Sequence, residues 1–198
     1  MSELFSIQLQ NRQQQGRDGV WLDLPTTTEQ VQAALRQIGI SSDNPQGLFI
    51  SGYFAEEEKR FAIPYNMVLA SNVDELNFLA SRLETLSTGE CAELNAALQA
   101  PQSELFSIGR ITDFPENVDY YVHLPDVRGP AQLGDYYLNR SGMVDMPEEW
   151  KGGIDTAQFG RYVAQQEQGV FTEYGYLVKS GDEWQKVHEG QPVPEEYR

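Results

Sequence analysis

Hydrophobic and polar residues alternate in three short segments near the beginning of the chain. These segments span residues 3–9, 20–24 and 47–54. Such alternation is typical of strands that bury one face. Between the second and third segments, apolar residues recur every three or four positions from Val31 to Ile38, and Gly39 follows. This spacing predicts a helix that begins near the "TTTE" stretch and ends at the glycine. We therefore predict a small α+β domain over residues 1–60.

The middle of the chain has a helical pattern instead. Asn72 followed by Glu75 is an N-cap signal, and the four leucines after it fall on one stripe of a helix. These leucines are Leu76, Leu79, Leu83 and Leu86. A second short helix is predicted over residues 88–100, before Pro101. We predict a small helical domain over residues 61–109.

The last third returns to a mixed pattern. We predict a strand at 118–124, helices at 129–142 and 155–169, and a closing hairpin made of strands 170–178 and 183–187. These elements predict a second α+β domain over residues 110–187. Residues 188–198 contain two prolines and few apolar side chains, so we expect a flexible tail.

The hexapeptide "SELFSI" occurs at residues 2–7 and again at 103–108. The similarity stops at once on the C-terminal side, where "QLQNRQQQG" faces "GRITDFPEN". We interpret the repeat as chance similarity and not as an internal duplication.

The charge of the chain is strongly negative. Lysine and arginine number 14 against 30 aspartates and glutamates, which gives a formal net charge of −16. The acids recur from Glu3 to Glu196, which favours a folded body with a negative surface over an acidic tail. Such a field repels nucleic acid and anionic membranes and attracts basic proteins. Charge alone is equally compatible with a simple role in solubility.

Few residues could carry out chemistry. Two histidines and one cysteine do not provide a zinc site of the usual spacing or a disulfide framework. Phosphate-binding loops, dinucleotide fingerprints and nucleophile elbows do not occur in the sequence. We therefore predict no enzyme activity, catalytic residue, cofactor or metal. The sequence also carries no signal peptide and no stretch of about 18 apolar residues, so we expect a cytoplasmic protein without a membrane partner.

Tyrosines occur in close pairs in the last third of the chain, for example Tyr120 with Tyr121 and Tyr136 with Tyr137. Aromatic pairs beside basic residues would suggest stacking on nucleic acid. Here Asp119 and Asp135 are the neighbours, and they would repel phosphate. Core packing or a protein interface is the better interpretation.

Several stretches in order resemble the ArdA family of antirestriction proteins. They are "VWLDLP" (20–25), "GLFISGYF" (47–54), "VDELNFLASRLETL" (73–86), "LGDYYLNRSG" (133–142), "GIDTAQFGRYVA" (153–164) and "FTEYGYL" (171–177). The resemblance implies an elongated acidic homodimer of three small domains. It also implies a protein that mimics bent double-stranded DNA and occupies the DNA-binding groove of Type I restriction–modification enzymes, with contacts to the methyltransferase core and its specificity subunit.

The resemblance assigns roles to two groups of residues. The acidic surface that stands in for phosphates would comprise Glu56, Glu57, Glu58, Asp74, Glu75, Glu84, Glu90, Glu93, Asp113, Glu116, Asp119, Asp126, Asp135, Asp145, Glu148, Glu149 and Asp155. The dimer interface or the core would comprise Leu76, Leu79, Leu83, Leu86, Tyr136, Tyr137, Phe159 and Tyr162. Two departures are visible: the stretch 156–162 carries fewer acids than is usual in the family, and about 20 C-terminal residues extend past the resemblance.

The charge is sufficient for such a mimic. B-DNA carries one negative charge per roughly 1.7 Å of its axis, so 16 charges would match about 27 Å of duplex. Two other interpretations stay open. The chain could be an acidic adaptor that binds another basic protein of a mobile element, or a small hydrolase that uses a pair of carboxylates.

Overall fold

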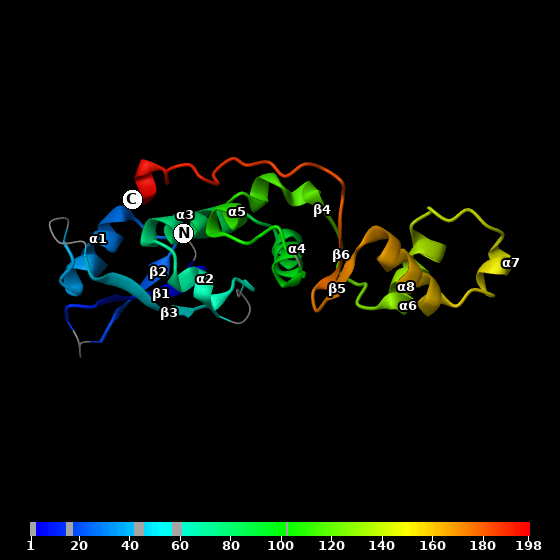
Figure 1. Cartoon of the computed structure of the whole chain (residues 1–198), viewed down its shortest axis with the longest axis horizontal. Coiled ribbons are helices and arrows are strands. Elements are labelled where there is room, and N and C mark those ends of the chain that lie inside the picture. The colour runs from blue at the N-terminus through cyan, green and yellow to red at the C-terminus, as the bar shows by residue number, and fades with distance from the viewer. Residues whose placement is uncertain (1–2, 15–17, 42–45, 57–60, 102) are drawn as a thin grey trace. The chain divides into compact units, whose positions relative to one another are not determined.

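The computed structural model describes residues 3–14, 18–41, 46–56, 61–101 and 103–198. Contacts within the chain divide it into two compact units. The first unit comprises Met1–Ser87, Leu105–Glu116 and Gln185–Arg198, and the second comprises Thr88–Glu104 and Asn117–Trp184. The described residues form eight α-helices and two three-stranded sheets, which confirms the predicted α+β class (Figure 1). The division into three domains at residues 60, 109 and 187 stays a prediction.

The sheet of the first unit is built from the three alternating segments. It comprises β1 (Phe5–Asn11), β2 (Val20–Leu24) and β3 (Leu48–Phe54), in the order β2-β1-β3. Both neighbouring pairs are antiparallel. In β2, Leu22 and Leu24 are buried while Trp21 and Asp23 are exposed, so one face belongs to the core and the other meets solvent.

Helices of the first unit pack on this sheet and on one another. They are α1 (Thr28–Gln37), α2 (Tyr65–Leu69), α3 (Val73–Leu83) and α5 (Ile108–Thr112), and α1 and α3 both contact β2. Leu76, Leu79 and Leu83 are buried, so the core is the correct alternative for these three leucines. The helices α2 and α5 were not predicted. Pro64 is the N-cap of α2, where the missing N–H of proline costs little.

A buried asparagine ties α3 to the chain ahead of α1. The Thr26 backbone N–H donates to Asn77 Oδ1 at 2.7 Å, and Asn77 Nδ2 donates to the Thr26 carbonyl at 3.0 Å. A buried amide that is fully paired in this way specifies the position of the helix, because any shift would leave polar groups unsatisfied.

The second unit combines one sheet with helices. The helices are α4 (Thr88–Gln99), α6 (Pro130–Asp135), α7 (Glu148–Lys151) and α8 (Thr156–Glu167), with a π-helical turn, η4 (Tyr136–Arg140), after α6. The strands are β4 (Tyr121–Leu124), β5 (Val170–Thr172) and β6 (Gly175–Lys179), in the order β4-β6-β5. Val127, Leu133 and Tyr176 form a small buried hydrophobic core in this unit.

The closing hairpin was predicted in the wrong place. The strands β5 and β6 pair with each other around Glu173 and Tyr174, and residues 183–187 are not a strand. Thr172 explains the early turn, because its hydroxyl accepts the Tyr174 N–H and donates to the Gly175 carbonyl. Gly175 has φ +131°, a value that L side chains rarely adopt.

Two glycines allow α6 and α8 to pack closely. A Cβ at Gly134 would lie 1.9 Å from the Thr156 carbonyl oxygen, and a Cβ at Gly160 would lie 1.8 Å from the Pro130 carbonyl oxygen. Any side chain at either position would therefore force the helices apart.

The two copies of "SELFSI" differ in structure. The first leads into strand β1, whereas the second ends in the first turn of α5, where the Ser107 hydroxyl accepts the Arg110 N–H as the N-cap. The different surroundings support the interpretation of chance similarity.

The C-terminal segment, residues 185–198, contacts the first unit in several places. The rings of His188 and Tyr197 lie 5.0 and 5.1 Å from the ring of Phe78 on α3. Thr28 Oγ1 donates to the Glu196 carbonyl at 3.2 Å. The flexible tail that we expected over residues 188–198 stays a prediction.

Among the residues that the structure describes, no helix is both long and apolar enough to cross a membrane.

Candidate acidic surface

The first turn of α3 places two acids at the edge of the first unit. Asn72 and Glu75 form a capping box in which Glu75 Oε2 accepts the Asn72 backbone N–H at 3.2 Å. Asp74 and Glu75 also lie at the positive end of the helix dipole, which favours their negative charge. Glu75 thus has a structural role in addition to its charge.

Asp74 is partly buried. Burial raises the pKa of Asp74, while the nearby Arg198 opposes that rise and Glu75 adds to it. Arg198 belongs to the C-terminal segment, so this segment brings a positive charge toward the acidic turn.

Glu84 is an exposed acid at the other end of the same helix, where it is the C-cap. The C-terminus of a helix carries partial negative charge, which disfavours a carboxylate. Helix stability therefore does not explain a glutamate at this position, whereas a role in a negative surface would.

The second unit gathers acids around α4. Burial, together with the neighbouring Glu90 and Asp119, raises the pKa of Glu93 to about 8. Much of the Glu93 population is therefore protonated at neutral pH, which makes it a weak substitute for a phosphate.

Most of the other predicted acids are at the surface. Those that are exposed in the structure are Glu56, Glu84, Asp119, Asp126, Asp145, Glu148, Glu149 and Asp155. Asp155 is also the N-cap of α8 and accepts the Ala157 and Gln158 N–H groups. Glu57 and Glu58 lie outside the described residues.

Basic residues neutralise part of this charge. Glu116 pairs with Arg82, Asp135 with Arg140 at 2.6 Å, and Glu148 with Lys151 at 2.9 Å. The hydrogen bonds from Arg140 and Asn139 hold the pKa of Asp135 below its usual range. Each of these three carboxylates contributes less to an external field than it would without its basic partner.

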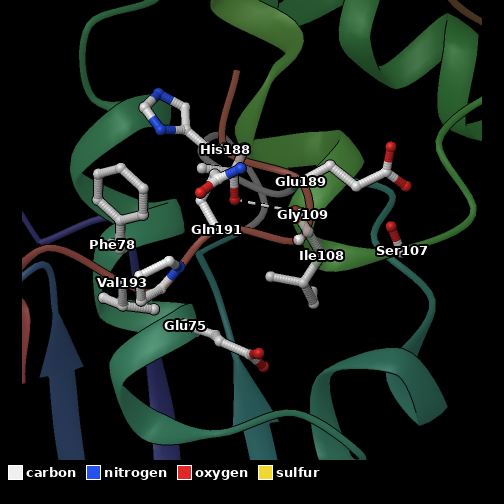
Figure 2. Close-up of a pocket in the computed structure, with 12 residues that line it drawn as sticks. Glu75, Phe78, Ser107, Ile108, Gly109, His188, Glu189, Gln191 and Val193 are labelled. Atoms are coloured by element: carbon white, nitrogen blue, oxygen red, sulfur yellow. Dashed lines mark hydrogen bonds between the residues drawn. The ribbon is translucent and has the colours of Figure 1, made fainter. Parts of the chain in front are cut away.

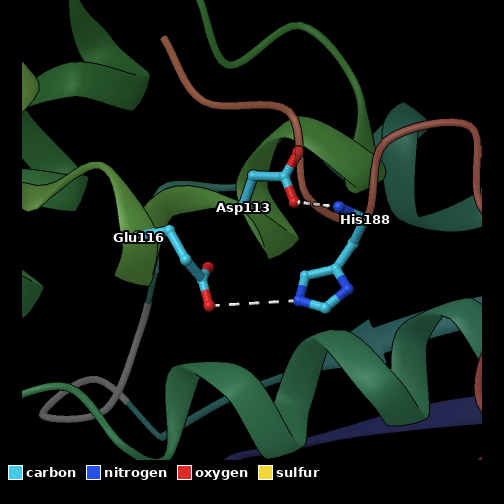
Figure 3. Close-up of side chains that lie close together, drawn as sticks. All are labelled: Asp113, Glu116 and His188. Carbon is cyan, nitrogen blue, oxygen red and sulfur yellow. Dashed lines mark hydrogen bonds and ion pairs between the residues drawn. The ribbon is translucent and has the colours of Figure 1, made fainter.

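Asp113 does not belong to the predicted surface, because its side chain is buried. Figure 3 shows Asp113 directed at the backbone of the C-terminal segment. Its two oxygens accept the N–H groups of His188 at 2.6 Å and Glu189 at 3.2 Å. Its sequence position gave no sign of this role, because the partners lie 75 and 76 residues away.

Asp113, Glu116 and His188 are close enough to raise the question of a metal site (Figure 3). His188 Nε2 lies 4.0 Å from Glu116 Oε1, the oxygen that pairs with Arg82. A guanidinium beside this carboxylate opposes a cation, and Asp113 already accepts two N–H groups. The cluster therefore holds the C-terminal segment in place.

A pocket of about 440 Å³ lies in the first unit beside this segment (Figure 2). Phe78, Ile108 and Val193 give it an apolar part. Its polar lining comprises Glu75, Ser107, Thr112, His188, Glu189 and Gln191.

The groups in this pocket that could act as nucleophile or base already have structural partners. Glu75 and Ser107 cap helices, and Thr112 Oγ1 donates to the Ile108 carbonyl at 2.9 Å. Glu189 pairs with Arg110 at 3.3 Å. These contacts give Glu75, Ser107, Thr112 and Glu189 structural roles.

The residues predicted for an interface or a core have mixed surroundings. Tyr136 and Tyr137 pack against the core of the second unit, and the Tyr137 hydroxyl donates to Glu167. Phe159 is partly buried and Tyr162 is exposed, and an interface at these two residues stays a prediction. Leu86 is partly buried.

Comparison with known proteins identifies one family. No curated protein matches the sequence. Residues 15–178 match the family of antirestriction proteins named ArdA, and this match spans most of the 198 residues. Residues 179–198, which include the C-terminal segment, lie outside it. The chain therefore belongs to the ArdA antirestriction family.

Proposed function

We propose that this protein is a non-enzymatic antirestriction protein that mimics bent double-stranded DNA. In this proposal a homodimer occupies the DNA-binding groove of a Type I restriction–modification enzyme and contacts its methyltransferase core and specificity subunit. Family membership carries the proposal, because it implies an antirestriction role and an interaction with restriction enzymes. The homodimer, the Type I target and the contacts with its subunits are what the resemblance to this family implies.

The distribution of charge supports mimicry. Exposed acids occur in both units, from Glu56 in the first to Asp155 in the second, and the net charge is −16. Enzymes that bind DNA neutralise phosphates with lysine and arginine, so carboxylates fixed on a folded protein can engage the same groove. A folded protein also avoids the energy that bending DNA costs, which favours it in competition.

The test is a pull-down of a purified Type I methyltransferase complex with this protein as bait and duplex DNA as competitor. We expect capture that weakens as DNA or salt is added, because exposed charge pairs are screened. A ternary complex of enzyme, DNA and this protein would contradict mimicry. Failure to capture the enzyme together with capture of another basic protein would instead favour the adaptor.

A further inference from the structure

The solvent face of the β2-β1-β3 sheet carries an exposed aromatic surface. Trp21 is 49% exposed and Phe54 is 58% exposed, although both lie on strands. The register places Trp21, Gln8 and Gly52 in one row across the sheet. The next row comprises Asp23, Ser6 and Phe54.

The indole of Trp21 lies across the middle of this face. Its Cη2 atom comes within 3.0 Å of the position that a Cβ on Gly52 would occupy, two strands away. The glycine therefore leaves room for the ring to lie over Gln8 and β3. In this orientation the Trp21 indole exposes a flat aromatic surface to solvent.

Two carboxylates converge beside the aromatic surface. Ser6 Oγ lies 2.8 Å from Asp23 Oδ1 and 3.2 Å from Glu3 Oε1. Asp23 stands two residues from Trp21 on the same face of β2, and Phe54 lies opposite Ser6.

An aromatic face beside two carboxylates is complementary to arginine. A guanidinium is planar, stacks on aromatic rings and donates to carboxylates as a fork, whereas a lysine ammonium is a compact point charge. The chain already pairs arginine with aromatic rings at two other places, with Arg12 over Phe49 at 5.3 Å and Arg110 over Phe106 at 4.7 Å.

We propose that this face, defined by Trp21, Phe54, Asp23 and Glu3, is a docking surface for an arginine side chain of a basic protein partner. Charge complementarity argues for a basic partner, and the exposed ring argues for arginine over lysine. In the context of the proposed function, which this inference refines, the partner is the restriction enzyme. The face would then add an apolar anchor to a surface that otherwise acts through charge.

The first experiment measures binding of deca-arginine and deca-lysine peptides by calorimetry at about 0.3 M salt, where exposed charges are strongly screened. We expect wild-type protein to bind deca-arginine about tenfold more tightly than deca-lysine, which corresponds to about 1.4 kcal/mol. Trp21→Ala and Trp21→Leu should both abolish this preference, because leucine keeps apolar area but has no aromatic face. Trp21→Phe should retain most of it and shows that the site tolerates substitution.

Phe106→Ala is the matched control. Phe106 is 62% exposed in the same unit, but its ring is occupied by Arg110. The preference for arginine should survive this change. Equal preference in wild-type protein and Trp21→Leu, or no preference in the wild type, would overturn the inference.

The second experiment repeats the comparison with a purified Type I methyltransferase complex. Trp21→Ala should weaken binding about tenfold at both low and high salt, while amide substitutions of exposed acids should matter only at low salt. Unchanged binding of Trp21→Ala with loss of binding in the acid variants would reject the inference and leave the proposed function standing. If the protein prefers deca-arginine but does not bind the enzyme, the arginine-binding face stands and the proposed function is rejected. Dissociation of a dimer by Trp21→Ala, seen by light scattering, would assign the face to a second copy and overturn the inference.

Discussion

At the scale of single residues, the acids of this protein fall into different physical classes. Glu75 caps a helix, Asp113 is buried against backbone N–H groups, and Glu116 pairs with an arginine. Glu84 and Asp126, in contrast, are exposed to solvent. A uniform list of acids from the sequence therefore overstates how many can act as phosphates.

Glu93 should make stability depend on pH. Its folded-state pKa is about 8 against an ordinary value of 4.5, so the folded protein binds more protons than the unfolded chain between these values. Stability from this group is fully present below about pH 4.5 and is lost as pH rises through about 8.

Glu93→Gln should therefore raise the urea midpoint near pH 8.5 and leave it almost unchanged near pH 4.5, as measured by circular dichroism. Glu90 is unsuitable as a control, because its charge contributes to the pKa shift of Glu93. The control is Glu149→Gln, at an exposed acid. The same pH dependence in Glu93→Gln and wild type would contradict the assignment.

Asp113 should hold the C-terminal segment. Asp113→Ala leaves the His188 and Glu189 N–H groups without this acceptor, and unsatisfied buried donors cost about 1–3 kcal/mol each. We expect lower stability and faster trypsin cleavage after Lys186, followed by mass spectrometry. Asp145→Ala changes an exposed acid, and trypsin should cleave this variant at the wild-type rate. Equal cleavage rates of the two variants would contradict the proposed role of Asp113 in holding the C-terminal segment.

At the scale of elements, the periodic segments were predicted well and the contacts between them were not. Strands β1 to β3 and helices α1, α3, α4 and α8 follow from local spacing and caps. The helices α2 and α5 have five residues each, too few for a periodic pattern. The closing hairpin was misplaced, because the turn at Thr172 depends on hydrogen bonds that polarity alone does not reveal.

The same limit applies to the candidate site. Composition and the family resemblance indicated an acidic protein, and the leucine stripe indicated a buried helix face. The burial of Asp113, the raised pKa of Glu93 and the aromatic face around Trp21 all depend on residues far apart in the sequence. Pairing of this kind follows from the tertiary fold and has no local signature.

The contact between α6 and α8 should depend on its glycines. Gly160→Ala would place a methyl group against the Pro130 carbonyl, and forced overpacking costs about 1–3 kcal/mol. Gly152→Ala is the control, because a Cβ there meets nothing within 4 Å. We expect a lower melting temperature for Gly160→Ala alone. Equal melting of the two variants would contradict this view of the interface.

At the scale of the whole molecule, the proposed mimic requires assembly. The exposed Tyr162 and the partly buried Phe159 belong to the part of the chain that we expect to form the dimer. Light scattering at micromolar concentration should report twice the chain mass of 22.4 kDa. Tyr162→Glu should shift the population toward monomer, because it brings a charge into an apolar contact. A wild-type protein that stays monomeric would reject the dimer.

We expect that a pattern of charge, and not a single site, inhibits restriction. The most direct measurement is inhibition of a Type I enzyme in vitro by five single amide variants and by their combination. The variants are at Glu84, Asp119, Asp126, Asp145 and Glu149, which are all exposed, and Glu75 is left intact because it caps α3. Exposed ion pairs are worth roughly 0–1 kcal/mol each, so each single variant should lose at most about fivefold. The combination should lose about a hundredfold while circular dichroism shows an intact fold. A single amide that abolishes inhibition in a folded protein, or a combination that inhibits as well as the wild type, would contradict the account.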